Sequence, residues 1–222
     1  MKRNLCIVIT LILTALVIIA GAVLGDKYYA AVTVIIALLS CVPFLVSFDG
    51  NSSRRVVILA VMTALTVAGR FVFAPIPFFK PVTAMVVISA MYFGSELGFL
   101  TGALSAVISN FYFGQGPWTP FQMFSWGIIG LVAGILSDPL KRSRIILCIY
   151  AVLSGIAYSM IMDVWTTLWA DNSFNPERFI ASVTASAPIT LIYAVSNVIF
   201  LLILTPLFGK KIQRIIDKYG KM

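Results

Sequence analysis

Residues 91–136 read "MYFGSELGFLTGALSAVISNFYFGQGPWTPFQMFSWGIIGLVAGIL" and contain two long apolar runs joined by a corner rich in glycine and proline. The runs cover residues 97–113 and 121–137. Each is close to the roughly 20 residues that a helix needs to cross a hydrocarbon core of about 30 Å. No water is available there to bond the backbone, so each run is predicted to be helical. The stretch predicts two membrane helices joined by a tight corner at residues 114–120.

The same pattern extends through the whole chain of 222 residues, of which 60% are hydrophobic and only 11% charged. Further apolar runs of similar length precede and follow the first two. The sequence therefore predicts an all-α polytopic membrane protein with eight spans. The remaining six runs are 5–25, 28–47, 56–75, 82–95, 144–162 and 179–208.

The basic residues are concentrated in every second connection between spans, at 2–3, 54–55, 141–144 and 210–221. Positively charged connections stay in the cytoplasm, so this bias predicts that both termini are cytoplasmic. The net charge of +8 is then an orientation signal and not a nucleic-acid footprint. The outer face is predicted to comprise residues 76–81, the corner at 114–120 and a loop at 163–178.

The residues needed for most catalytic or metal sites are missing. The chain has no histidine and no Walker A motif, which removes the common zinc ligand and the phosphate-binding loop of ATPases. Cys6, Cys41 and Cys148 all lie in apolar runs and are predicted to be small buried side chains. We expect no enzyme activity, metal or cofactor, and any ATP hydrolysis would take place in partner subunits.

Aromatic and polar side chains gather at the predicted outer end, which contains all four tryptophans. An interfacial aromatic belt would place tryptophan at both membrane surfaces, so the asymmetry favours a binding pocket, with the belt as the alternative. Arg70, one turn inside its span, is either a snorkelling anchor or a polar group beneath this pocket. The candidate binding residues are Phe78, Phe79, Lys80, Asn110, Gln115, Gly116, Trp118, Thr119, Gln122, Trp126, Asp163, Trp165 and Trp169.

The span at 56–75 carries Ala60, Ala64 and Ala68 at intervals of four residues. This spacing keeps them on one helical face, where small side chains let a second helix approach closely. Such patterns are common in membrane helices, and alone they indicate only helix packing.

Residues 55–208 resemble the substrate-binding S component of energy-coupling factor (ECF) transporters. The resemblance is carried by the alanine face, by "FAPIPFFKP" at 73–81 and by the long stretch at 91–136. It implies a six-span core, here within residues 51–222 with its basic C-terminal tail. Residues 1–50 would add two transmembrane helices beyond the family norm, and their role stays open.

The resemblance further implies that the chain captures a vitamin outside a bacterial plasma membrane. Through the alanine face it would dock on a transmembrane coupling subunit that two ATPase subunits drive. The corner "GQGPWTPFQM", residues 114–123, is most similar to members assigned to cobalamin and other corrinoids. The alternatives are an S component for another vitamin or micronutrient, such as riboflavin or a queuosine precursor, and a stand-alone secondary carrier.

Overall fold

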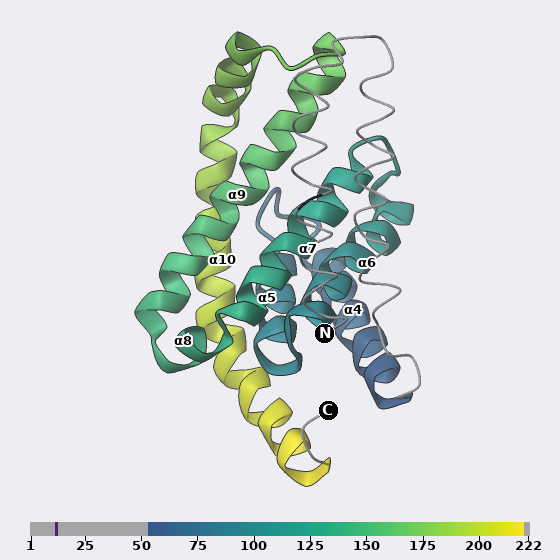
Figure 1. The fold of residues 1–222 in the computed structure, drawn as a ribbon, viewed down its shortest axis with the longest axis vertical. Helices are drawn as coiled ribbons and strands as arrows, with labels where there is room; N and C mark the ends of the chain where they lie inside the picture. Colours follow the sequence, from purple (N-terminus) through teal and green to yellow (C-terminus); the bar gives the residue numbers. More distant parts are fainter. Residues whose placement is uncertain (1–11, 13–52, 220–222) are drawn as a thin grey trace.

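A computed structural model describes residue 12 and residues 53–219, and in this part of the chain the regular elements are all helices (Figure 1). The all-α prediction is confirmed, and each of the six predicted core spans corresponds to one helix. The spans predicted at 5–25 and 28–47 lie outside the described residues, except for residue 12. The helices are α4 (Ser53–Val72), α5 (Val82–Phe93), α6 (Ser95–Phe113), α7 (Thr119–Ile135), α8 (Ser137–Arg142), α9 (Arg144–Asp171) and α10 (Pro176–Tyr219).

Within the described residues, α4, α9 and α10 are long and apolar enough to cross a membrane, and α5 and α7 are shorter apolar helices. α5 lies at the centre, where every residue from Val82 to Met91 is buried. A helix that is apolar on all sides is expected in a protein interior or in contact with lipid, and α5 lies in the interior. α4 and α6 pack on one side of α5, and α10 packs on another. The core thus surrounds α5.

Glycines allow the two closest helix pairs to approach backbone to backbone. A Cβ added to Gly98 of α6 would lie 2.9 Å from the carbonyl oxygen of Gly130 in α7. A Cβ added to Gly155 of α9 would lie 2.8 Å from the backbone nitrogen of Ala194 in α10. Real Cβ atoms essentially never approach this closely. The small residues therefore set the distance between α6 and α7 and between α9 and α10.

The long outer loop predicted at 163–178 is wrong, because α9 continues to Asp171 and the connection is only four residues long. The residue after the helix, Asn172, caps it in a left-handed conformation with φ 52°. The side chain of Asn175 caps the start of α10. Its oxygen accepts hydrogen bonds from the backbone N–H groups of Glu177 and Arg178 at 3.0 and 3.2 Å. The α9–α10 hairpin extends beyond α4 and α7 at this end of the molecule (Figure 1).

The span predicted at 144–162 stops before Asp163, because a charged residue usually marks the end of a membrane span. In the structure Asp163 is 7% exposed, and its carboxylate accepts a hydrogen bond of 2.7 Å from Ser186 of α10. A hydroxyl on the neighbouring helix therefore compensates the buried carboxylate, and the helix continues past it. Asp163, Trp165 and Trp169 are helical residues and not loop residues.

Candidate functional site

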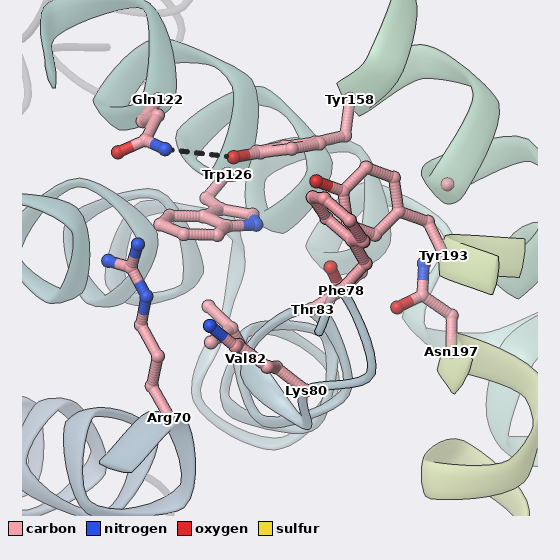
Figure 2. A pocket seen from close by; sticks show the side chains of 11 residues that line it. Arg70, Phe78, Lys80, Val82, Thr83, Gln122, Trp126, Tyr158, Tyr193 and Asn197 are labelled. Carbon is pink, nitrogen blue, oxygen red and sulfur yellow. Dashed lines mark hydrogen bonds between the residues drawn. The ribbon is translucent and has the colours of Figure 1, made fainter. Parts of the chain in front are cut away.

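A partly open cavity of about 210 Å³ lies where α4 ends and the connection to α5 begins. Side chains from α4, α5, α7, α9 and α10 converge on it, together with the connection at residues 73–81 (Figure 2). Convergence of many elements is typical of ligand sites in helical bundles. The lining residues are Arg70, Phe78, Lys80, Val82, Thr83, Gln122, Trp126, Gly155, Tyr158, Tyr193 and Asn197.

One wall of the cavity is a continuous set of aromatic rings. Trp126 of α7 stacks on Tyr158 of α9, with ring centroids 5.1 Å apart and an interplanar angle of 20°. Tyr158 meets Tyr193 of α10 edge to face at 5.2 Å, and Tyr193 meets Phe78 in the same way at 6.0 Å. Such offset and edge-on pairs stabilise one another and leave flat faces available to a planar ligand.

A chain of hydrogen bonds crosses four helices beside this wall. Arg70 of α4 donates to the amide oxygen of Asn110 in α6 at 2.8 Å and also to the hydroxyl of Ser109. The amide nitrogen of Asn110 donates to the amide oxygen of Gln122 in α7 at 2.8 Å. Gln122 in turn donates to the hydroxyl of Tyr158 in α9 at 3.1 Å (Figure 2). These four helices are therefore joined by one polar network.

The glycine-rich corner joins the same network. Asn110 also donates to the hydroxyl of Thr119 at 2.9 Å, and Thr119 donates to the side-chain oxygen of Gln115 at 3.0 Å. The backbone N–H of Gly116 makes a long contact of 3.4 Å with that hydroxyl. Gly114 adopts φ 103°, a conformation that L side chains rarely adopt, so a glycine is favoured where α6 ends. None of the residues named in this paragraph lines the cavity. The corner therefore supports the site indirectly, through the hydrogen bonds of Asn110 to Thr119 and Gln122.

Phe78 enters the cavity from an unusual backbone conformation, with φ 60°. For a non-glycine residue such a conformation costs about 1–3 kcal/mol, and such residues cluster at functional sites.

Two residues further along the chain, the backbone of Lys80 makes two hydrogen bonds with the hydroxyl of Ser196 in α10. The hydroxyl accepts from the Lys80 N–H at 3.1 Å and donates to the Lys80 carbonyl at 3.3 Å. Burial, followed by the charge of Arg70, lowers the pKa of the Lys80 ammonium.

Five of the predicted binding residues lie away from the cavity. Phe79 packs into the core against Phe73 and Phe200. Asp163 lies between α9 and α10, bonded to Ser186 as described. The other three form a separate outer aromatic cluster. Its members are Trp118, Trp165 and Trp169, with Trp165 in contact with both others at centroid distances of 5.9 and 6.3 Å.

Four predicted residues, Phe78, Lys80, Gln122 and Trp126, do line the cavity. Asn110, Gln115, Gly116 and Thr119 support it through the hydrogen bonds given above. The sequence did not predict Val82 and Thr83 of α5 as lining residues, nor the contributions of α9 and α10. The latter are Gly155, Tyr158, Tyr193 and Asn197.

A signal for these missed residues was present in their spacing. Gly155 and Tyr158 are three residues apart, and Tyr193 and Asn197 are four apart, so each pair shares a helical face. Arg70, for which two interpretations were open, is 9% exposed and bonded inside the protein, which excludes a snorkelling anchor.

The predicted docking residues Ala60, Ala64 and Ala68 are exposed along one face of α4. Arg70, near the end of the same helix, is buried and lines the cavity. In the part of the chain that the structure describes, no group of His, Cys, Asp and Glu side chains could hold a metal ion. The arrangement suits non-covalent binding of an organic molecule that has a flat apolar face and a polar edge.

Two curated proteins are similar to this chain. A UPF0397 protein of Aliivibrio salmonicida (strain LFI1238) is 24% identical over 148 residues, which covers 64% of this chain and 78% of the relative. A UPF0397 protein of Vibrio atlanticus (strain LGP32) is 30% identical over 89 residues, which covers 38% of this chain but only 48% of that relative. No solved structure matches the chain.

The family comparison covers much more of the chain. The model described as "ECF-type riboflavin transporter, S component" matches residues 50–214, the whole described bundle apart from the end of α10. Members of this family are substrate-binding subunits of transporters and not enzymes. The predicted resemblance to ECF S components is confirmed, whereas the comparisons do not support the cobalamin type specifically. The chain therefore belongs to the ECF-type riboflavin transporter S component family.

Proposed function

We propose that this chain captures riboflavin, or a closely related flavin, outside the cell for ATP-driven uptake. The observation that carries the proposal is the cavity itself. The stacked faces of Trp126 and Tyr158 would contact a flat ring system, and Gln122, Thr83 and Asn197 offer hydrogen bonds to its polar edge. Mostly apolar walls with a few placed polar groups are the usual design of such sites. The description of the matching family supports the same ligand.

A corrinoid is the second candidate, and the outer aromatic cluster of Trp118, Trp165 and Trp169 is the observation that favours it. These rings offer a wide surface outside the cavity. The cavity of about 210 Å³ is below the range of about 300–1,000 Å³ that holds drug-sized ligands, and a corrinoid is larger than those. The size of the cavity therefore favours a flavin, the smaller of the two molecules.

Titration calorimetry of the purified protein with riboflavin, cobalamin and a purine-type queuosine precursor tests this proposal. We expect a clear binding isotherm with riboflavin and none with the other two. Binding of cobalamin alone would replace the flavin with the corrinoid. A clear isotherm with the queuosine precursor alone would assign the chain to a different micronutrient.

The remaining expectations for transport are part of the same proposal. The chain would use its alanine face to dock on a coupling subunit driven by two ATPase subunits, with both termini in the cytoplasm. Family membership argues against a stand-alone secondary carrier. For the orientation, a cysteine introduced at Asn172 should react with an impermeant reagent on intact cells, and one at Arg142 should not. The reverse pattern would refute this topology.

A further inference from the structure

The cavity is lined by two basic side chains and by no acidic one. Arg70 enters from α4 and Lys80 from the connection between α4 and α5 (Figure 2). Both cations face the same ring, Phe113, at 4.6 and 4.8 Å from its centroid. They therefore lie within reach of a single small ligand.

The partners of Arg70 are neutral. Its guanidinium donates to Ser109 and Asn110, and it lies 5.3 Å from the centroid of Trp126. Among the described residues, the ion pairs join Arg55 to Glu96 at 2.8 Å and Arg178 to Asp171 at 2.6 Å. Neither ion pair includes Arg70. A buried cation without a counter-ion loses hydration that neutral acceptors and ring faces replace only in part.

Lys80 adds a second positive charge to the same space. Its backbone is held by Ser196, and its ammonium lies over the same Phe113 ring as the guanidinium of Arg70. The positive charge of Arg70 contributes to the lowered pKa of its ammonium, as expected for two like charges near each other. This arrangement costs free energy when the cavity holds no anion.

Asp163, an acidic residue of α9, does not neutralise the charges of Arg70 and Lys80. Asp163 of α9 forms neither of the described ion pairs and does not line the cavity. Its carboxylate instead accepts from Ser186, whose hydroxyl contacts that of Ser159 at 3.5 Å. Within the described chain, the cavity therefore has excess positive charge that a ligand can compensate.

We infer that the ligand presents an anionic oxygen group, a phosphate or a carboxylate, to Arg70 and Lys80. The inference rests on the proposed function for the ring system and adds the charge of the molecule. For a flavin it means that riboflavin 5′-phosphate binds more tightly than riboflavin. Arginine and lysine form strong, charge-assisted hydrogen bonds with such groups, and these gain strength in a dry site.

The test is fluorescence titration of the purified full-length protein with riboflavin and with riboflavin 5′-phosphate. We expect the phosphate to bind about tenfold more tightly or better, and Lys80→Gln to remove most of that preference. Lys141→Gln is the matched control, because the Lys141 ammonium also lies over a ring, that of Tyr92, at 4.9 Å but away from the cavity. It should leave the preference unchanged.

A parallel titration with biotin and its uncharged amide separates a carboxylate from a phosphate as the preferred group.

Mass spectrometry of the molecule that copurifies with the protein gives a readout that does not depend on flavins. An anionic molecule that is not a flavin would refute the proposed ligand and support its inferred charge. Equal affinity for both flavins, or riboflavin itself as the copurifying molecule, would overturn the inferred charge while leaving the flavin in place. A neutral or cationic copurifying molecule that is not a flavin would overturn both. Absence of any binding and of any copurifying molecule would overturn both.

Discussion

The guanidinium of Arg70 donates a hydrogen bond of 2.8 Å to the amide oxygen of Asn110, across the interface between α4 and α6. Asn110 is 1% exposed, and its amide nitrogen donates to Thr119 and to Gln122 at the same time. One amide thus connects the buried cation, the glycine-rich corner and the cavity wall. Every polar atom of this side chain is used.

Asn110→Ala should therefore be costly. It removes the donor to the side-chain oxygen of Gln122, one of two donors to Thr119 and an acceptor of Arg70. Each buried group left unsatisfied costs about 1–3 kcal/mol. We expect a lower thermal midpoint in detergent and weaker ligand binding, measured by differential scanning fluorimetry and titration calorimetry.

Ser105→Ala on the same helix is the control for Asn110→Ala. The Ser105 hydroxyl is buried and has no hydrogen-bond partner in the described part of the chain, so its removal should leave stability unchanged or slightly higher. Equal thermal midpoints for the two variants would show that the Asn110 network contributes no stability.

The contributions of the Tyr158 ring and hydroxyl can be separated. Tyr158→Phe keeps the stacking on Trp126 and loses only the hydrogen bond from Gln122, whereas Tyr158→Leu loses both. We expect the affinity for riboflavin to fall by about 1 kcal/mol for Phe and by roughly 2 kcal/mol for Leu. Calorimetric titration of both variants measures the difference. If Tyr158→Leu bound as tightly as the native protein, the aromatic wall would have no part in binding.

The contact between Gly155 and Ala194 predicts a large effect of a single methyl group. Gly155→Ala would place a Cβ 2.8 Å from the backbone nitrogen of Ala194, so α9 and α10 would have to separate. We expect destabilisation of about 1–3 kcal/mol, the usual cost of overpacking, seen as a lower thermal midpoint. Val152→Leu adds a methylene at a position of α9 that is 37% exposed, and it should be tolerated. Similar losses in both variants would argue against a constrained interface.

The exposed alanine face predicts a separation of binding from transport. Ala64→Trp should leave riboflavin binding by the isolated subunit intact, because Ala64 is exposed and does not line the cavity. Uptake by cells that also contain the coupling and ATPase subunits should be lost, since the bulky side chain prevents close helix packing. Leu153→Trp, at an exposed position of α9, is the control for added bulk. Normal uptake with Ala64→Trp would exclude the alanine face from docking.

The pH dependence of binding should follow Lys80. Its pKa is lowered from the ordinary lysine value of 10.5, so the ammonium loses its proton at a lower pH than usual. A phosphate ester remains fully ionised above about pH 7. The preference for riboflavin 5′-phosphate over riboflavin should therefore decline before the pH reaches 10.5, and it should be flat in Lys80→Gln. A constant preference in the native protein up to that pH would contradict this prediction.

Much of the fold was predictable because membrane helices are encoded locally. Each of the six core helices coincides with an apolar run of the sequence, as expected for helices in a bilayer. Their lengths vary more than the bilayer thickness predicts, since α5 has 12 residues and α10 has 44. The boundary of α9 was not predictable in this way, since the partner of Asp163 is Ser186, on the next helix. Whether a helix continues past a charged residue depends on whether another helix supplies a hydrogen-bond partner. Such a contact is part of the tertiary structure and leaves no local signal in the sequence.

The candidate site was predictable on the side of the corner and not on the side of α9 and α10. Asn110, Thr119 and Gln122 are concentrated in one short stretch, so their cooperation left a local signal. Tyr158 and Tyr193 are single tyrosines in apolar helices and become neighbours only when α9 packs on α10. Position along the spans predicted Trp118, Trp165 and Trp169 in the same pocket as Trp126, but a similar depth in the membrane does not place side chains in one cavity.

A single helix, α4, contributes both to the cavity and to the exposed alanine face. Arg70 lines the cavity, and Ala60, Ala64 and Ala68 are exposed. An anion that shifted α4 through Arg70 would therefore also shift the alanine face. A partner that distinguishes two positions of α4 would change ligand affinity by the same factor as the ligand changes partner affinity, because linkage is reciprocal. Loading could then control docking without a separate signalling element, and docking could in turn expel the ligand.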